Sequence, residues 1–220
     1  MLRYLLRAIK IARRNSWAKF TTGYTQWYFR ANGVRLGRDI LSNGVPELEM
    51  SLSGSFTAGE DLQLQNGPRY NMIGRQQKCY FVIGKGANLT IGDHVGLSGV
   101  AIVCHERISI GSNALVGMNC VIYDTDFHDL DYRKRALRPE DYSGVVTKPV
   151  TIGNHTFIGA HSTILKGVTI GDRAIIGAGS VVAKSVPAGE IWAGNPARFI
   201  SMTPTGIAER QTVITLNQVG

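Results

Sequence analysis

The sequence IGNHTFIGAHSTILKGVTIGDRAIIGAGSVV (Ile152–Val182) repeats one pattern every six residues. Its aliphatic positions follow one another at that spacing: Ile152, Ile158, Ile164, Ile170, Ile176 and Val182. A glycine comes directly after four of them. A period of six fits neither an amphipathic helix nor the simple alternation of an isolated strand. It predicts a solenoid, in which each hexapeptide forms one flat side of a coil and turns its aliphatic residue into the core.

The same spacing occurs earlier in the chain and adds further predicted core positions, which are Ile91, Leu97, Val103, Ile110, Val116 and Ile122. The interval from Ile122 to Ile152 is a whole number of periods, so the segment between them can leave the coil and rejoin it in register. That segment, 123–151, is rich in Asp, Arg, Tyr and Pro and contains no repeat. It predicts a loop extruded from a rigid scaffold, where functional residues often lie.

Three further motifs accompany the IGxxxx repeats: a histidine-bearing loop DTDFHDLDYRKR (124–135), a re-entry KPVTIGNHTFIG (148–159) and a closing AGNPARFI (193–200). Together, from about Ile83 to Ile200, they resemble the hexapeptide-repeat acyltransferases. The resemblance is strongest to the galactoside, maltose and xenobiotic O-acetyltransferases and to their relatives in polysaccharide biosynthesis. It implies an all-β solenoid, a left-handed parallel β-helix of triangular section, with a homotrimer as the assembly and acetyl-CoA as the donor.

We predict three parts. Residues 1–31 form a basic, amphipathic, helical N-terminal arm, residues 32–200 the β-helix acyltransferase domain with its active-site loop at 123–151, and residues 201–220 a C-terminal tail. A chain of 220 residues needs no second globular domain. Its three cysteines have no metal-binding spacing, which favours reduced thiols and a cytoplasmic location. No apolar stretch is long enough to span a membrane, and no secretory leader is expected.

Positive charge is concentrated at the start of the chain. Residues 1–38 hold nine Lys or Arg and no acid, while the remainder has 15 bases against 16 acids. On a helix, one face carries Arg3, Arg7, Lys10 and Arg14, and another carries Leu2, Leu5, Leu6 and Ile9. This pattern predicts peripheral contact of residues 1–20 with an anionic membrane, at its inner face. The alternative is a cap on the open end of the solenoid. Nucleic acid is not expected, because large apolar groups accompany the bases.

Acetyl transfer to a hydroxyl needs a base, a donor for the carbonyl oxyanion and a cradle for the coenzyme. The resemblance places His128 at the catalytic position, and imidazole titrates near neutral pH. It also places Asn119 where the sugar acetyltransferases contact the acceptor. Asp124 and Asp126, close to the histidine, are further candidates for binding substrate hydroxyls. The alternative for each of these residues is a solvated loop or turn position.

For the donor, the resemblance implies a groove between neighbouring subunits in which the Ala160 amide serves the thioester oxygen. The candidate coenzyme-binding residues are Phe157, Gly159, Ala160, Gly177, Ala178, Lys184 and Arg198. Lys184 and Arg198 match basic residues near the phosphates, although solvated charges at coil ends are the alternative. Phe157 stands where many sugar acetyltransferases have tryptophan.

The sequence therefore predicts an acetyl-CoA-dependent O-acetyltransferase that acts on a sugar hydroxyl in surface polysaccharide or glycoconjugate assembly, with a lipid-linked saccharide favoured as acceptor. Two alternatives stay open, an N-acyltransferase for an amino sugar and a non-catalytic β-helix that binds a partner. A zinc hydratase on the same fold would need three converging imidazoles. The five histidines offer no close pair of the expected spacing, so no metal is predicted.

Overall fold

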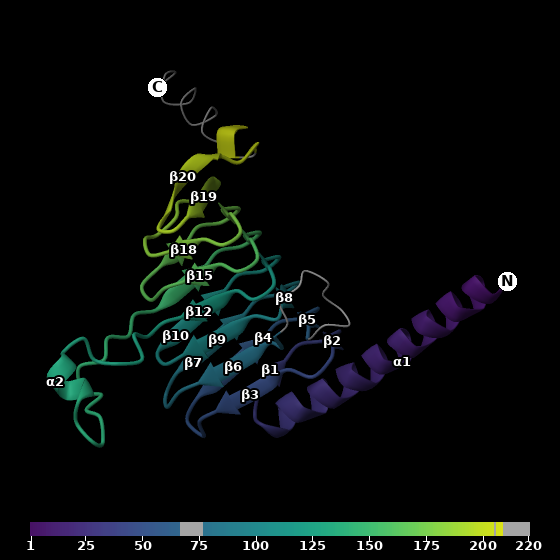
Figure 1. Ribbon diagram of the computed structural model, residues 1–220, viewed down its shortest axis with the longest axis horizontal. Coiled ribbons are helices and arrows are strands. Elements are labelled where there is room, and N and C mark those ends of the chain that lie inside the picture. The colour runs from purple at the N-terminus through teal and green to yellow at the C-terminus, as the bar shows by residue number, and fades with distance from the viewer. Residues whose placement is uncertain (67–76, 205, 209–220) are drawn as a thin grey trace.

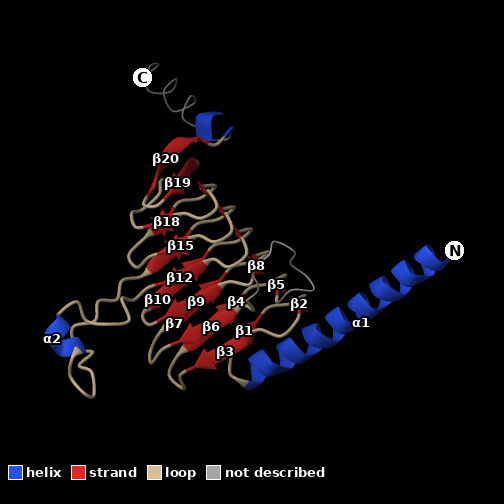
Figure 2. Cartoon of the chain, viewed as in Figure 1, coloured by secondary structure: helices blue, strands red, loops and turns tan. Residues whose placement is uncertain are grey.

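The computed structural model describes residues 1–66, 77–204 and 206–208, so residues 209–220 of the predicted tail lie outside the described part. The chain winds into a tapering stack of coils, with a long helix against its base and an extruded loop at its side (Figure 1). Figure 2 shows that the walls of the stack are short strands joined by turns. The strands form three sheets, here called A, B and C, one for each side of the coil.

Sheet A contains β1 (Arg35–Leu36), β4 (Ser55–Ala58), β7 (Asn88–Ile91), β10 (Arg107–Ile110), β13 (Val150–Ile152) and β16 (Thr169–Ile170). Sheet B contains β2 (Leu41–Asn43), β5 (Gln63–Gln65), β8 (Gly96–Ser98), β11 (Leu115–Val116), β14 (Phe157–Ile158), β17 (Ile175–Ile176), β19 (Glu190–Gly194) and β20 (Ala197–Met202). Sheet C contains β3 (Glu47–Met50), β6 (Tyr80–Ile83), β9 (Ala101–Cys104), β12 (Val121–Tyr123), β15 (Thr163–Ile164) and β18 (Val181–Val182).

From β1 to β18, successive strands belong to sheets A, B and C in turn and pair in parallel from coil to coil, whereas β19 joins sheet B beside β17. Ile110, for example, pairs with Ile91 in one direction and with Ile152 in the other. The predicted left-handed parallel β-helix with an N-terminal helix is thereby confirmed. At the far end, β20 runs antiparallel to β19. This hairpin continues to Met202, two residues beyond the predicted boundary at Ile200.

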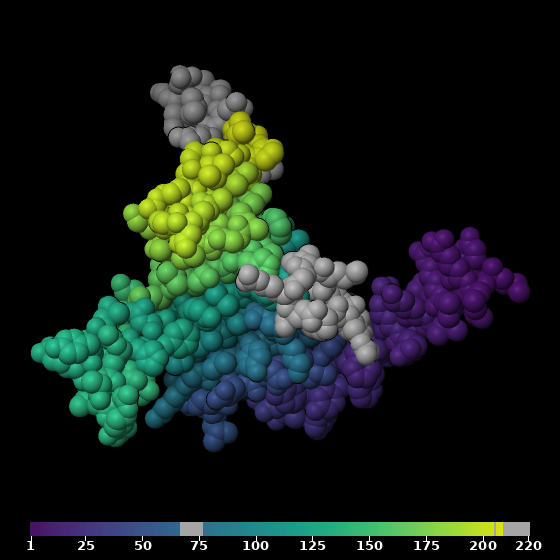
Figure 3. All heavy atoms as spheres, in the orientation of Figure 1, coloured from purple at the N-terminus to yellow at the C-terminus, as the bar shows by residue number. Residues whose placement is uncertain are grey.

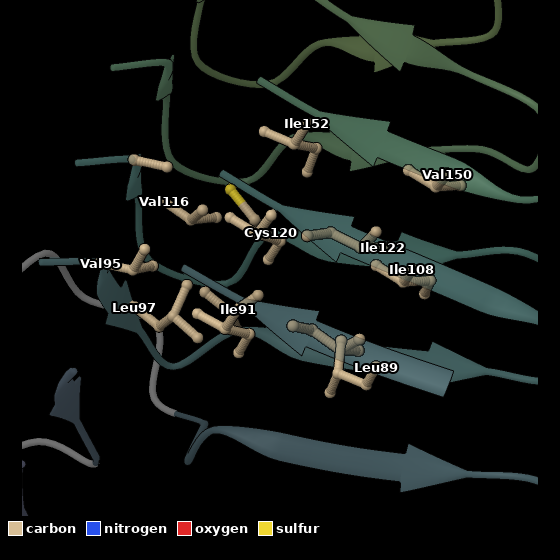
Figure 4. Close-up of a cluster of buried hydrophobic side chains, with 14 of the residues drawn as sticks. Leu89, Ile91, Val95, Leu97, Ile108, Val116, Cys120, Ile122, Val150 and Ile152 are labelled. Carbon is tan, nitrogen blue, oxygen red and sulfur yellow. The ribbon is translucent and has the colours of Figure 1, made fainter. Parts of the chain in front are cut away.

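Aliphatic side chains fill the interior of the coils (Figure 4). All six predicted positions from Ile152 to Val182 are buried, none more than 1% exposed. The prediction that Val103 belongs to the core is wrong. Ile102 and Cys104 are buried on either side of it, and Val103 is only partly covered, because alternate residues of a strand face opposite sides. The core residues Leu97 and Ile102 are thus five apart, a local break in the hexapeptide period.

Helix α1 (Leu2–Ala31) closes the N-terminal end of the core with its last turns. Phe29 is fully buried, and its ring centroid lies 5.8 Å from those of both Phe56 and Phe81. The Thr21 hydroxyl donates a 2.6 Å hydrogen bond to the carbonyl of Ser42 in β2. The C-terminal half of the helix therefore acts as a cap, which covers apolar side chains that the first coil would otherwise expose. None of the described helices combines the length and apolar content needed to cross a bilayer.

Candidate active site

The extruded loop leaves the coil after β12. The two segments at its base, residues 124–126 and 146–148, are here called the neck, and Asp124 anchors this neck to the coil. Asp124 is fully buried, and its carboxylate accepts backbone hydrogen bonds from His105 at 2.7 Å, Glu106 at 2.8 Å and Arg107 at 2.9 Å. A carboxylate that accepts three amide hydrogens fixes the turn that donates them. Both carboxylate oxygens of Asp124 thus already accept hydrogen bonds from the backbone. In this conformation neither oxygen is directed at a substrate, and the predicted substrate contact stays a prediction.

A short antiparallel contact closes the neck. Thr125 pairs with Thr147, and the Asp126 amide donates to the carbonyl of Val146 at 3.1 Å. The Asp126 carboxylate forms an ion pair with Lys166 of the next coil. The structure therefore places Asp126, predicted to bind substrate, in a contact that holds the loop against the β-helix.

The backbone makes a tight turn just before His128. The His128 amide donates to the Asp126 carbonyl at 2.7 Å, and Phe127 between them has a φ of 64°, which is uncommon for a residue with a side chain. The Phe127 ring packs edge-on against Tyr123, with centroids 5.0 Å apart, and against His105 at 6.3 Å. These contacts hold Phe127 in its strained conformation and so fix the start of the His128 side chain.

The imidazole of His128 is oriented by a carboxylate that the sequence analysis missed. Its Nδ1 lies 2.8 Å from Oε1 of Glu140, whose side chain is 15% exposed, whereas that of His128 is 59% exposed. An ionised carboxylate only accepts hydrogen bonds, so Nδ1 is the donor in this contact, and in the neutral imidazole Nε2 then holds the lone pair. No described residue hydrogen-bonds Nε2. The Tyr142 ring centroid lies 6.3 Å from that of the imidazole. The pair therefore has the geometry of a general base with its orienting group.

The other acids near His128 support the loop itself. The backbone amide of Asp131 bonds the Asp129 carboxylate at 2.8 Å and lowers the pKa of Asp129. Asp131 caps the short helix α2 (Tyr132–Arg135) by accepting from the Arg133 amide at 2.9 Å. An ion pair of 3.1 Å joins Lys134 to Asp129. The carboxylates of Asp129 and Asp131 are thus bound within the loop itself. Of the described carboxylates, Glu140 is the one that contacts the imidazole of His128.

A second group of predicted residues lies where the chain turns from sheet B to sheet C, here called the BC corner, which comprises residues 117–120, 159–162 and 177–180 in successive coils. Asn119, His161 and Gly179 occupy equivalent places in these turns and have positive φ, and amides donate to the coil before, His161 to Met118 and Gly179 to Ala160, both at 2.8 Å. The amide oxygen of Asn119 is buried and accepts no hydrogen bond from the described residues. Asn119 lies in the coil before that of Ala160, and its contact with the acceptor stays a prediction.

Coil stacking explains the predicted glycines of this corner. A Cβ at Gly159 would lie 2.5 Å from the Ala178 nitrogen, and one at Gly177 would lie 2.8 Å from the Ala193 Cβ. The next coil therefore occupies the space that these glycines leave. The corner itself carries small side chains, with Ala160 half-buried and Ala178 exposed on neighbouring coils. The Ala160 amide donates to none of the described residues. The contact of both glycines with coenzyme stays a prediction.

The three other predicted coenzyme residues lie on different parts of the coil, with Lys184 at the turn that follows sheet C. Phe157 is 48% exposed on the outer face of sheet B, in register with Leu115 and Ile175 on the neighbouring strands, and shallow depressions flank it. Lys184 follows β18 and is exposed. Arg198, also exposed, lies in β20 of the closing hairpin and donates to the carbonyl of Ala197 at 2.9 Å. These three residues stay predicted contacts.

The structure separates the predicted residues into two groups within one chain. Asp124, Asp126 and His128 belong to the loop that leaves between sheets C and A, whereas Asn119, Ala160 and Ala178 lie at the BC corner. These corners are one side of the coil apart, about 15–20 Å for a hexapeptide. Figure 1 shows that the loop bearing α2 projects away from the coils. One chain therefore does not bring the histidine and the BC corner together.

The cysteines are not candidates for nucleophilic chemistry. Cys79, Cys104 and Cys120 are free and buried. Burial raises the pKa of Cys79 and Cys120 to about 11. Burial and the charge of Asp124 raise the pKa of Cys104 to about 12. The thiolate, which is the reactive form, is therefore scarce at neutral pH. The described residues also contain no cluster of three or more side chains suited to a metal ion.

Comparison with known proteins agrees with the repeat. Residues 149–184 match the family model for the bacterial transferase hexapeptide, six repeats. Residues 149–184 thus carry the hexapeptide repeat of bacterial transferases, and the resemblance seen in the sequence is confirmed at that level. No curated protein matches the sequence significantly.

Several solved structures are similar. AntD, an N-acyltransferase from Bacillus cereus solved with dTDP and coenzyme A, has a TM-score of 0.66 at 22% identity over 88% of this chain and 98% of its own. A hexapeptide-repeat acetyltransferase from Vibrio cholerae is 34% identical over 52% of this chain, with a TM-score of 0.47, and the match spans 62% of its length. A galactoside acetyltransferase solved with coenzyme A gives 24%, over 76% and 64% of the two chains, with a TM-score of 0.45. The likeness to AntD establishes the fold.

The role of Glu140 leads to a prediction. Glu140→Gln keeps the size of the side chain but weakens its hydrogen bond to the imidazole. A bond to a charged group contributes about 1.5–3 kcal/mol, so we expect kcat for acyl transfer to fall roughly 10- to 150-fold. KM and the unfolding temperature should stay near the parent values, because Glu140 contacts only the base. The matched control is Glu106→Gln, since the Glu106 side chain is exposed and forms none of the described ion pairs. A loss of kcat in the control, or a parental kcat in Glu140→Gln, would contradict the role.

Proposed function

We propose that the chain is an acyltransferase that moves the acetyl group of acetyl-CoA to a sugar hydroxyl, with His128 as the general base. One observation carries the proposal: on a chain with bacterial-transferase hexapeptide repeats, a solvent-exposed imidazole is held by Glu140 through Nδ1, with Nε2 available. This is the arrangement that proton abstraction from a hydroxyl requires. The exposed loop position suits a large acceptor such as a saccharide.

The reaction then follows from the roles of the residues. Nε2 of His128 takes the proton from the acceptor hydroxyl, whose oxygen attacks the thioester carbonyl carbon. The Ala160 amide donates to the oxygen that becomes negative in the tetrahedral intermediate. The carbon–sulfur bond breaks as the carbonyl re-forms, and the departing thiolate takes the proton back from His128. Glu140 stabilises the imidazolium between these two steps. The products are an acetyl ester and free coenzyme A.

The BC corner suits the donor. Small side chains at equivalent positions, Ala160 and Ala178, leave the backbone of successive coils open to a narrow pantetheine chain. Two exposed positive charges lie further along the chain, Lys184 at the turn after sheet C and Arg198 in the closing hairpin of sheet B. These are the groups that a nucleotide phosphate would contact.

The separation of the two groups of residues supports a homotrimer with a site between subunits. Within one chain the loop histidine and the BC corner lie on different corners of the coil. In a threefold ring, the loop of one subunit can reach the BC corner of its neighbour, and three equivalent sites result. The exposed apolar side chains Leu115 and Phe157 on sheet B offer a surface for that neighbour. We place the reaction in the cytoplasm, with a saccharide as acceptor; the buried, reduced thiols agree with this compartment.

The function is tested by coenzyme-A release from acetyl-CoA in the presence of candidate saccharides, followed by analysis of the product. An O-acetyl sugar loses its acetyl group in mild alkali, whereas an N-acetyl sugar keeps it. Alkali-labile product supports the proposal, and alkali-stable product would show an N-acyltransferase for an amino sugar. Absence of measurable coenzyme-A binding would reject the enzyme altogether and leave the partner-binding scaffold.

The phosphate contact gives a separate prediction. The double change Lys184→Ala/Arg198→Ala should weaken coenzyme-A binding roughly 10-fold or more, because two charge-assisted contacts are lost. Binding of a short acetyl thioester without the nucleotide should not change, since it lacks the phosphates. Lys85→Ala is the matched control, an exposed lysine on an early coil. Calorimetry with both ligands measures the effect, and equal weakening for both would reject the phosphate contact.

A further inference from the structure

One face of α1 carries an apolar stripe that points away from the β-helix and is interrupted in the middle by Arg13 and Ser16. The docked face is marked by the buried residues Thr21, Thr25 and Phe29. At 3.6 residues per turn, the opposite side carries large apolar residues in the first turns of the helix and again from Trp17 to Trp27. These residues, here called the outward stripe, are Leu2, Leu5, Leu6, Ile9, Trp17, Phe20, Tyr24 and Trp27, from 42% exposed at Tyr24 to 69% at Leu2. Capping the coil therefore does not explain them.

The aromatic part of the stripe is continuous. Ring centroids are 5.7 Å apart for Trp17 and Phe20, 6.4 Å for Phe20 and Tyr24, and 5.6 Å for Tyr24 and Trp27. Further towards the N-terminus, the first turns of the helix stand clear of the body (Figure 3). An apolar surface of this extent, on a helix with its opposite side already docked, is typical of an interaction site.

The charge on the helix is complementary to an anionic surface. Residues 1–31 contain seven Lys or Arg and no acid. Arg3, Arg7, Lys10 and Arg14 lie to one side of the outward stripe, Lys19 and Arg30 lie to the other, and Arg13 lies within it. None of the ion pairs found among the described residues involves α1. Bases that border an apolar stripe can reach lipid headgroups while the stripe enters the acyl boundary.

We infer that the outward stripe of α1 binds the surface of an anionic membrane, with the helix lying flat in the interface. Trp and Tyr favour this boundary because their rings are apolar and their N–H and O–H groups remain hydrated. A second copy of the helix fits less well, since both partners would bring the same excess of positive charge. The binding does not depend on the proposed function. Its consequence does: the transferase would meet a saccharide acceptor that is carried on a lipid.

The test uses the full-length protein and flotation with two kinds of vesicle, phosphatidylcholine alone and phosphatidylcholine with about a third phosphatidylserine. The parent should float with the anionic vesicles, and less so as salt is raised. Phe20→Ser/Trp27→Ser should weaken binding roughly tenfold or more, because two large rings no longer enter the lipid. The matched control, Leu52→Ser/Phe199→Ser, removes two exposed apolar side chains from other parts of the chain and should bind like the parent.

A second variant guards against misfolding. Arg7→Gln/Lys10→Gln keeps the outward stripe and should lose binding to the anionic vesicles while its unfolding temperature stays unchanged. Parental flotation of both double variants would overturn the inference, as would a parent that binds neither vesicle. If the Phe20/Trp27 change instead dissociates an oligomer and leaves flotation unaltered, a second copy covers the stripe and the inference is wrong. Acetyl transfer to a soluble sugar should be the same in these variants as in the parent. A loss of vesicle binding with unchanged activity therefore tests the membrane contact independently of the proposed function.

Discussion

His128→Ala should lower turnover about 100- to 10,000-fold while leaving coenzyme-A affinity unchanged. The expected loss is that of a general base, because no other described side chain hydrogen-bonds Glu140 or stands ready to replace the imidazole. His128 lies on the extruded loop and is largely exposed, so its removal leaves the buried core intact. Steady-state kinetics and calorimetry with coenzyme A measure the two quantities. His94→Ala is the matched control, since His94 is an exposed histidine at another turn, paired with Asp61.

The same variant tests whether the site lies between subunits. His128→Ala retains an intact BC corner, and Lys184→Ala/Arg198→Ala retains an intact loop. Mixed trimers of the two should recover part of the activity, because some interfaces then combine one intact half from each parent. Full activity of His128→Ala would reject the mechanism. Inactive mixed trimers of verified composition would instead place both halves of the site in one chain.

Phe29→Ala should destabilise the protein by about 3–5 kcal/mol, the usual cost of deleting a buried aromatic side chain. Phe29 is fully buried between Phe56 and Phe81, so its loss leaves a cavity at the end of the core. For a domain of this size the unfolding temperature should fall by roughly 6–20 °C. Because a solenoid is stabilised by contacts between neighbouring coils, the first coils should open before the rest. Hydrogen exchange should therefore rise most in β1, β2 and β3.

Trp27→Ala is the matched control for the cap. Trp27 is also a large aromatic residue of α1, but it is 62% exposed and lies on the outward stripe. Its removal should change the unfolding temperature little and weaken vesicle binding instead. Equal destabilisation by the two changes would mean that the helix does not cap the core through Phe29.

The sequence predicted some residues of the candidate site and missed others. His128 and the BC-corner residues were found because their positions relative to the repeats are fixed by the motif. Glu140 was not, since it follows His128 by twelve residues in a segment without periodicity, and only the folding of the loop brings its carboxylate within 2.8 Å of Nδ1. The structural contact of Asp124 was likewise not visible in the sequence. Beside a histidine Asp124 resembled a substrate ligand, whereas its buried carboxylate fastens the neck to the His105–Arg107 turn.

Helix α1 shows the same limit in another form. Its composition predicted both a membrane contact and a cap, and the sequence offered no choice between them. The structure separates two faces of the helix, because Thr21, Thr25 and Phe29 share the face that docks while Trp17, Phe20 and Trp27 point away. A helical wheel shows which residues share a face, but only packing against the coil reveals which face is covered.

The amino-acid sequence by itself determined the solenoid, the coil register across the loop, and the helix. These features are local: each hexapeptide specifies one strand and one turn, and its aliphatic residue has no option other than the interior of the coil. Only the tertiary structure decided the inward residue in β9, the partner of His128, the role of Asp124 and the outward face of α1. Each of these depends on contacts between residues far apart in the chain, which the repeat period does not encode.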